Sequence, residues 1–543
     1  MFNFQPTGMM MSKDIKDPVF ILLSILIGII TFFIFLDVTI INPKNIAWLM
    51  KGDPAQHYLG WSTFRHTPLI QWPIGMNYNY GMAVSSSIVF TDSIPLIAIP
   101  LKYFNFILPS EFQYTGIWLL LCFILQSFFG YKILNHLTKN NLFSLAGGFI
   151  LSFAPIFLLR TQGHYALSAQ FLILAAFLLY LKPFSTKKWT ILICITALVH
   201  AYLLMMVLLF FVAKTIVSAT ESRNFRKHII SFFTAILFCL FIMYAEGYFM
   251  VSNGLAASGF GEYRSDLLSL FNPSSAYFSR FTRVNNNQLQ NGEGLGYIGF
   301  GVIICLSSLY LLCAKKIEEN KKILFSAPII LPSLIIVGCF LYSVSNIVSL
   351  QGFEIFRFNL PDFLVGPVNT FRASGRFIWP VSYLVIITSI FSLWFLNKNA
   401  CLPLIAIVAI VQFYDISKFG EMSKSSIKNT ETSWNKNNIN DYKVDFSKFQ
   451  SVAMYPPKDF NDKSNIIYLA ALHGLPVNAG YMARYDAVKD AEQNKNIDTL
   501  IQQKRLEKGI IYFIGESAKN LATLCGQGYV CQDGFAGRMM YKQ

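Results

Sequence analysis

The chain has 543 residues, of which 54% are hydrophobic and 13% are charged, and its formal net charge is +15. Because soluble domains usually carry about 25% charged residues, this composition excludes an ordinary soluble domain and indicates a membrane protein. The positive charge does not indicate a nucleic-acid partner, since most of the excess Lys and Arg falls in segments that we predict to be cytoplasmic.

Apolar runs of about 20 residues predict membrane-spanning helices along most of the chain. The first run, 18–41, is too long for a signal-peptide core and lacks a small-residue cleavage site, so we interpret it as a retained anchor. The predicted spans are 18–41, 113–136, 143–159, 165–181, 229–250, 295–314, 325–347, 375–396 and 400–417.

The stretch 189–217 needs a separate interpretation. A single long helix would place Lys214 and the cations that follow it on the outer side, against the positive-inside rule. A hairpin of two shorter helices that turns near His200 returns them to the cytoplasm. Its first arm is too short to span a membrane alone, so it should lie buried among its neighbours. This interpretation gives about 11 crossings, with the N-terminus in the cytoplasm and the C-terminus outside.

With this topology, the loops rich in polar residues lie on the outer side. They include the first loop, 42–92, and a second long loop, 251–294. Residues 93–108 are short and interrupted by Pro95 and Pro100, and we expect a re-entrant or interfacial segment on the same face. Such an asymmetry indicates binding or chemistry at the outer surface.

The first loop contains GDPAQHYLGW, in which Asp53 and His57 would share one face of a helix. A carboxylate held close to the membrane could act as a general base towards a hydroxyl group. Two other interpretations stay open: Asp53 as the N-cap of the following helix, because Pro54 comes next, or as a salt-bridge partner. The spacing of Asp53, His57 and His66 matches no strong metal motif, so we predict no cofactor. Binding of a divalent cation stays open as an alternative that the spacing does not support.

Further polar clusters occur at the predicted outer ends of the spans. LLRTQGHYAL carries Arg160 and His164, and VHAYLLM carries His200 and Tyr202. A histidine near a membrane interface is often only a structural hydrogen-bond donor, so binding and structural roles both stay open. The other outer segments contribute Asp92, Glu262, Arg264 and Glu293.

FRASGRFIWPVSY places Arg372 and Arg376 four residues apart at the predicted start of a helix. Guanidinium groups match phosphate oxygens in a bidentate manner, and a helix N-terminus adds N–H groups and partial positive charge. This pattern indicates phosphate binding. The alternative is that both arginines reach anionic lipid headgroups or pair with Glu262 or Glu293.

The composition changes near residue 418 to Lys, Asn, Ser and Asp, which indicates a linker over 418–447. Residues 448–543 are predicted to form a small outer α/β domain. Its strands are SVAMY and GIIYFIG, and 459–472 and 486–505 have helical periodicity. Cys525 and Cys531 could form a disulfide or remain free thiols in a turn.

These features resemble polytopic glycosyltransferases of the C superfamily (GT-C), which have about ten or more spans and an acidic residue soon after the first. The resemblance rests on GDPAQHYLGW, the Arg and His residues at helix ends, and FRASGRFIWP. With SSIVFTDSIPL and EGLGYIGFG added, the chain is similar to bacterial membrane proteins that we associate with O-antigen-modifying, serotype-converting glucosyltransferases.

The resemblance implies a GT-C-like, all-α polytopic protein in the bacterial inner membrane, with a periplasmic C-terminal α/β domain. It implies inverting transfer of a sugar, such as glucose, from a polyprenyl-phosphate donor to a periplasmic or lipid-linked glycan, with Asp53 as the base. No acidic neighbour accompanies Asp53, so a second acid would come from Asp92, Glu262 or Glu293.

The remaining candidates follow from this function. The expected donor phosphate ligands are Arg372, Arg376, Arg160 and Arg264. The expected substrate-binding residues are His57, Asp92, His164, His200, Tyr202, Glu262, Glu293, Trp61 and Tyr80, together with the nearby aromatics Trp72 and Tyr78. The segment NAGYMARYD, 478–486, is expected to cover the acceptor groove.

Three other classes of protein remain as alternatives. A flippase or transporter of lipid-linked glycans should show inverted repeats and ionisable residues near mid-span, whereas the charges here gather at one face. A phosphoethanolamine or acyl transferase needs an activated nucleophile or a metal cluster, which the outer loops do not reveal. A structural scaffold would not explain the convergence of polar clusters on one side.

Overall fold

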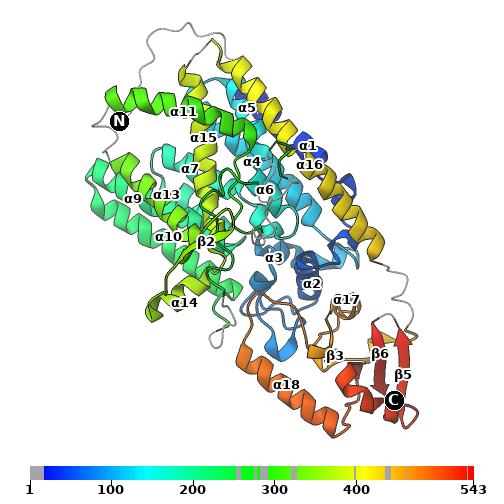
Figure 1. Cartoon of the computed structure of the whole chain (residues 1–543). Helices are drawn as coiled ribbons and strands as arrows, with labels where there is room; N and C mark the ends of the chain where they lie inside the picture. The colour runs from blue at the N-terminus through cyan, green and yellow to red at the C-terminus, as the bar shows by residue number, and fades with distance from the viewer. Residues whose placement is uncertain are drawn as a thin grey trace.

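In a computed structural model, the described residues are 17–251, 259–273, 278–281, 292–319, 327–396, 399–434, 442–461, 463–534 and 536–543. They form a helical bundle and a smaller C-terminal region with a sheet (Figure 1). Parts of the predicted second loop, 251–294, and of the predicted linker, 418–447, lie outside the described residues.

Seven helices among the described residues are long and apolar enough to cross a membrane, so the chain is a multi-pass membrane protein. These segments are Pro18–Phe35, Thr115–Thr138, Asn141–Arg160, Ala201–Ser222, Phe225–Glu246, Ser374–Phe395 and Cys401–Ser433. Shorter apolar segments, Tyr165–Leu181, Phe300–Tyr310 and Pro328–Val344, fall in other predicted spans. The total of 11 crossings therefore stays a prediction.

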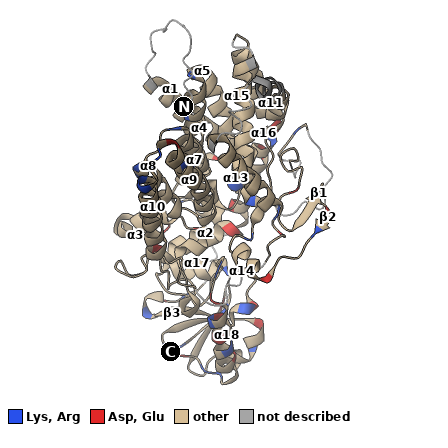
Figure 2. Cartoon of the chain, turned by 90° about the vertical axis from the view of Figure 1, so that its left-hand side faces the viewer, with Lys and Arg blue, Asp and Glu red and all other residues tan. Residues whose placement is uncertain are grey.

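The bundle packs around α4, which lies against α1, α5 and α7, and around α15, which lies against α11, α13 and α16. Most of the bundle is uncharged, as Figure 2 shows. The helices are α1 (Asp17–Phe35), α4 (Thr115–Thr138), α5 (Asn141–Ser152), α6 (Pro155–Arg160), α7 (Phe171–Leu181), α8 (Thr186–Ala197), α9 (Ala201–Ser222), α10 (Phe225–Glu246), α11 (Phe300–Glu319), α13 (Ala327–Val344), α15 (Ile378–Leu396) and α16 (Cys401–Ser433).

The predicted helical hairpin over 189–217 is confirmed. The 12-residue α8 ends at Ala197, and α9 begins at Ala201. His200 is the N-cap of α9, because its Nδ1 accepts a hydrogen bond from the backbone N–H of Tyr202. The turn thereby fixes the position of the His200 ring.

Shorter elements gather at one end of the bundle. The first loop contains α2 (Asp53–Phe64) and the 3-10 turn η4 (Ile88–Thr91), and the predicted segment 93–108 contains the short helix α3 (Pro95–Tyr103). The stretch between α13 and α15 holds a strand pair, β1 (Ile347–Leu350) with β2 (Phe353–Arg357), and α14 (Asp362–Thr370). No strand or helix was predicted between the spans 325–347 and 375–396, where these elements lie.

The C-terminal region contains a four-stranded sheet in the order β3-β4-β6-β5. The predicted strands and helices are confirmed, and Cys525 is disulfide-bonded to Cys531. Its elements are β3 (Ser451–Tyr455), α17 (Ser464–Leu472), α18 (Ala487–Gln502), β4 (Ile510–Ile514), β5 (Tyr529–Gly534) and β6 (Gly537–Lys542).

This region is joined to the first loop by backbone and side-chain contacts. Helix α17 packs against α2. The backbone N–H of Gly81 donates to the carbonyl of Val477 at 2.9 Å, and that of Val477 donates to the carbonyl of Asn79 at 3.1 Å. The two parts of the chain therefore meet along α2, and Gly474 lies beside His66, just past the C-terminal end of this helix.

The predicted linker differs from the structure at its start. Helix α16 continues to Ser433, so 418–433 is helical. Phe419, Ser423 and Ile427 continue the buried stripe of this helix at helical spacing. Over 418–433, the change to polar composition marks the exposed face of the same helix.

Candidate active site

A cavity of about 620 Å³ opens where the first loop, the bundle and the C-terminal region meet. This size is typical of a small-molecule site, for which ~300–1,000 Å³ is usual. Its charged lining residues are Asp53, Asp92, Glu293, Arg160, Arg372, Arg376 and Arg484, and its histidines are His164 and His200. Seven of the residues predicted for the site therefore share one cavity with Arg372 and Arg376.

Asp53 is the first residue of α2, and its side chain is 43% exposed. The N-cap of this helix is Gly52 rather than Asp53, so the capping interpretation is wrong. The carboxylate lies 3.5 Å from Nε2 of His164. Asp53 therefore faces the cavity from a fixed helix end.

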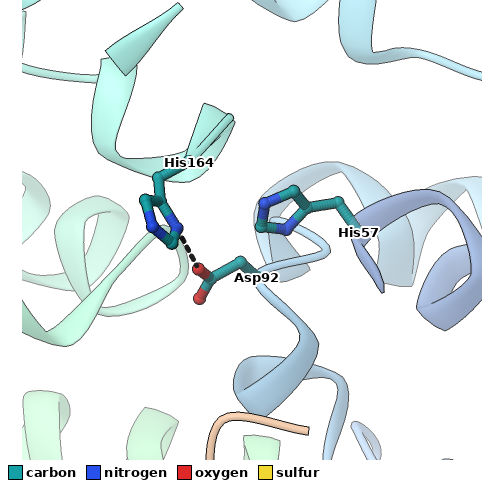
Figure 3. A group of neighbouring side chains, drawn as sticks. All are labelled: His57, Asp92 and His164. Atoms are coloured by element: carbon teal, nitrogen blue, oxygen red, sulfur yellow. Dashed lines mark ion pairs between the residues drawn. The ribbon is translucent and has the colours of Figure 1, made fainter. Parts of the chain in front are cut away.

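His164 connects three carboxylates. Its Nε2 lies 3.5 Å from Asp53 and 3.5 Å from Glu293, and its Nδ1 lies 3.6 Å from Asp92. Figure 3 shows the His164 ring and the Asp92 carboxylate facing each other. Asp53 and Asp92 come from the two ends of the first loop and Glu293 from the segment before α11, so only the folded chain brings them to this ring.

Asp92 ends the turn η4 with a positive φ of 53°, a conformation that Asp tolerates better than most residues. Its carboxylate faces Nε2 of His200 at 3.4 Å. Burial disfavours the charged form, but the nearby rings of His200 and His164 outweigh burial and hold the pKa of Asp92 well below its usual value. Because Nδ1 of His200 accepts from the backbone, its Nε2 carries the proton that points towards Asp92.

Glu293 neutralises part of the predicted phosphate site. Nε of Arg376 lies 2.6 Å from Oε2 and NH2 lies 3.2 Å from Oε1 of Glu293, while NH1 of Arg160 lies 3.0 Å from Oε1. Burial disfavours the carboxylate, but Arg160 and Arg376 hold the pKa of Glu293 well below its usual value. The alternative in which Arg376 pairs with Glu293 is therefore the one observed.

Two glycines allow this pairing. A Cβ on Gly375 would lie 2.6 Å from Cα of Gly294, and a Cβ on Gly294 would lie 2.1 Å from the carbonyl oxygen of Arg264. Because neither residue has a side chain, the backbones of EGLG and ASGR can approach closely, which brings Glu293 beside Arg376.

The two predicted arginines do not share one face of an α-helix. Arg376 lies in a 3-10 turn, Ser374–Phe377, before α15 begins at Ile378, and Arg372 precedes this turn. The guanidinium of Arg376 lies 4.5 Å above the ring of Tyr202, and that of Arg372 lies 5.7 Å from the ring of Tyr263. Both nevertheless line the cavity.

The C-terminal region closes one side of the cavity through Tyr481, Ala483 and Arg484. The backbone N–H of Ala483 donates to the carbonyl of Phe90 at 2.9 Å, and Arg484 donates to the carbonyl of Thr370. The segment 478–486 was expected to cover the acceptor groove, but Arg484 was not among the predicted site residues. A cation beside two aromatics in GYMARYD was the available signal.

Residues 25–417 match the family model described as "Domain of unknown function (DUF6311)", and residues 445–534 match "DUF6311 C-terminal domain". The chain belongs to the DUF6311 family. No curated protein matches the sequence.

In this DUF6311 chain, several predicted substrate ligands lie away from the cavity lining. Trp61 and Tyr80 are buried in the core, where the indole N–H of Trp61 donates to the carbonyl of Phe112. Trp72 and Tyr78 are exposed. The guanidinium of Arg264 donates to the carbonyl of Gly261. Neither Arg264 nor Glu262 lines the cavity.

A metal ion could draw on three residues of this DUF6311 site. Donor atoms of His57, Asp92 and His164 lie within 4.8 Å of one another, a grouping that their sequence spacing did not indicate (Figure 3). However, Nδ1 of His57 lies 3.0 Å from the carbonyl of Thr91, and Nε2 lies 2.7 Å from that of Gly163. A cation would have to displace one of these contacts, so the ligand set is incomplete as arranged.

Proposed function

We propose that this protein is a glycosyltransferase that moves a sugar from a polyprenyl-phosphate donor to a hydroxyl group of a glycan. The proposal includes about 11 crossings of the bacterial inner membrane, a cytoplasmic N-terminus and a periplasmic cavity. A disulfide between Cys525 and Cys531 is consistent with an oxidising compartment.

The observation that carries the proposal is the shared cavity of Asp53, Arg372 and Arg484. Tyr481 lies close enough to Asp53 and Arg372 for both charges to act on its hydroxyl group, although burial is the largest cause of its raised pKa. A carboxylate and guanidinium groups in one cavity suit a reaction in which one oxygen loses a proton and another gains negative charge.

In the proposed reaction, the oxygen of the acceptor hydroxyl attacks the anomeric carbon, and Asp53 accepts the proton of that hydroxyl. The bond from that carbon to the phosphate oxygen breaks, and polyprenyl phosphate leaves with the electron pair. Arg372 and Arg484 stabilise the phosphate, and the buried pair of arginines around Glu293 adds net positive charge behind them. His164, 3.5 Å from Asp53, orients the carboxylate.

The sugar is expected to lie among the remaining polar and aromatic groups of the lining. Tyr202, His200 and Asp92 form one wall, and Tyr481 forms another. Aromatic rings offer apolar faces to sugars, while the imidazole and carboxylate groups can bind hydroxyls. This arrangement supports recognition of a hexose.

The test is transfer from a labelled donor. Membranes that contain the protein are incubated with labelled polyprenyl-phosphate sugars and acceptor glycans, and labelled glycan is measured. Asp53→Asn should abolish most of the transfer. Asp498→Asn is the matched control, because its side chain is 45% exposed against 43% for Asp53 but lies on α18.

Two outcomes would contradict the proposal. Transfer by Asp53→Asn at the parental rate, in protein that is folded and inserted, would remove Asp53 as the base. Translocation of a lipid-linked glycan across vesicles, without transfer from any polyprenyl donor, would favour the flippase.

A further inference from the structure

The strand pair β1–β2 and the helix α14 expose a cluster of large apolar side chains. We call this cluster the hairpin face; its members are Phe353, Ile355, Phe356, Phe358, Phe363 and Leu364. Phe353 is 67% exposed, Phe356 58% and Phe363 77%. A hairpin in water normally covers one side with polar residues, so this exposure requires a partner.

Both sides of β2 are apolar. Successive strand residues point to opposite sides, so Phe353 and Ile355 lie on one side while Phe356 lies on the other. Glu354 and Arg357 form a bidentate pair with each other, at 2.8 and 2.6 Å, which leaves this strand with no net charge. A folded protein partner would cover one side, whereas lipid can surround both.

The hairpin is held firmly on its inner side. The carboxylate of Asp266 accepts from the backbone N–H of Gly352 at 3.0 Å, and the N–H of Leu267 donates to the carbonyl of Ser349 at 3.0 Å. The hydroxyl of Tyr342, on α13, lies 3.3 Å from the carbonyl of Val368, at the end of α14. The hairpin face is therefore presented outward by a fixed base.

Its position is continuous with the membrane-facing surface. The apolar helix α13 leads almost directly into β1 and packs against it. In Figure 2, β1 and β2 project sideways from the bundle, at a level where helices still run alongside. At the other end, α14 leads into Phe371 and Arg372, which line the cavity.

We propose that the hairpin face lies in the interfacial layer of the lipid bilayer, on the side of the membrane where the cavity opens. The depth is limited, because β2 is an edge strand of the two-stranded sheet among the described residues. Its outward backbone groups need water or headgroups as partners and do not belong in the hydrocarbon core. Aromatic side chains favour the interfacial layer.

This location also suggests how the donor reaches the cavity, an inference that rests on the proposed function. A lipid-linked donor diffuses in the plane of the membrane, and the hairpin face would hold the lipid surface next to Arg372. The phosphate of the donor then enters the cavity from the membrane edge, while the glycan acceptor approaches from the C-terminal region.

The membrane contact can be tested without any enzyme assay. A photo-reactive amino acid is placed at Phe356 or Phe363 in the full chain, which is reconstituted in phosphatidylethanolamine–phosphatidylglycerol vesicles. After illumination, mass spectrometry identifies the adducts. Phe238, 53% exposed on the span α10, is the positive control, and Val488, 62% exposed on α18, is the negative control.

We expect lipid adducts at Phe356 and Phe363 with a yield within about three-fold of that at Phe238, and none at Val488. Adducts to a second copy of the chain at both positions, or no lipid adducts at either, would overturn the proposal. Both results are independent of whether the protein transfers sugar.

A functional arm uses the double variant Phe353→Ser, Phe356→Ser. We expect KM for a long-chain polyprenyl donor to rise about 10-fold, as expected for losing buried aromatic area, with kcat little changed. For a short-chain, water-soluble donor, the double variant should show no change in KM. In the long-chain assay, the single variant Phe356→Trp should keep the KM of the parent chain. An equal rise in KM for both donors would overturn the inference that the hairpin face delivers the donor. If the protein transferred sugar from none of the donors, the proposed function would be rejected, whereas the result from the lipid adducts would still hold.

Discussion

The two ends of the cavity use charged residues in different ways. At the inner end, Glu293 binds Arg160 and Arg376, and all three side chains are buried. At the open end, Asp53, Arg372 and Arg484 line the cavity from three different segments, and Asp53 is partly exposed. An arginine in a suggestive motif can therefore belong to the scaffold, as Arg376 does, while a neighbouring one, Arg372, lines the open part of the cavity.

This contrast divides the expected effects of mutations. Changes at the inner end should act mainly on folding, because a buried charge that loses its partner is costly. Changes at the open end should act mainly on transfer and on donor binding. The following measurements test this division, from the largest effect to the smallest.

Asp53→Asn should lower the rate of transfer by roughly 10²–10⁴-fold, the usual contribution of general-base help. The asparagine keeps the size of the side chain but cannot accept the proton. Initial rates at saturating donor measure the effect. Thermal unfolding in detergent should be nearly unchanged, and a large loss of stability would move Asp53 to the scaffold.

Glu293→Gln should destabilise the protein by about 3–5 kcal/mol, because two buried guanidinium groups would lose their shared counter-ion. Chemical unfolding of the purified protein measures this free energy. Glu421→Gln is the control, since Glu421 also pairs with an arginine, Arg280, but is 70% exposed and should cost about 1 kcal/mol or less. Equal effects of the two variants would erase the distinction between the ends of the cavity.

Arg372→Ala and Arg484→Ala should each raise KM for the donor by roughly 10–100-fold, the effect of losing a hydrogen bond to a charged group. Lysine at either position should recover part of the affinity, because it keeps the charge but not the planar fork. Donor titrations provide the measurement. Arg538→Ala, at an exposed pair with Asp533, is expected to leave KM unchanged.

Acid should destabilise the fold through Asp92 and Glu293. The pKa of each carboxyl is lowered in the folded protein, so their contribution to stability is complete above the unfolded pKa values of about 3.9 and 4.3. It is lost progressively as the pH falls below about 4 towards the folded pKa values. Melting temperatures between pH 7 and pH 3 should fall less for Asp92→Asn than for the parent chain.

Chelation should have the smallest effect. Both ring nitrogens of His57 contact carbonyl oxygens, so Asp92 and His164 alone make an incomplete site. We expect EDTA to change transfer by less than about two-fold. Loss of transfer in EDTA, with recovery on adding a divalent cation, would show that His57 releases one of these contacts.

The elements with strong local signals were predictable. Seven apolar helices long enough to cross a membrane among the described residues, the hairpin at His200 and the strands SVAMY and GIIYFIG follow from apolar runs, charge bias and periodicity. The extension of α16 to Ser433 was missed, because a helix with one buried stripe has a polar average composition. The pair β1–β2 was missed because its exposed apolar residues do not alternate with polar ones.

Hydropathy and charge act locally along the chain, so the sequence alone is enough to predict a multi-pass membrane protein with polar clusters between its apolar runs. How those clusters divide depends on the folded structure. It placed Glu293 against Arg376 and Arg160, brought Asp92 to His164, and added Arg484 to the cavity wall. Pairing of charges about 70 to 130 residues apart in the sequence depends on distances that no local pattern encodes.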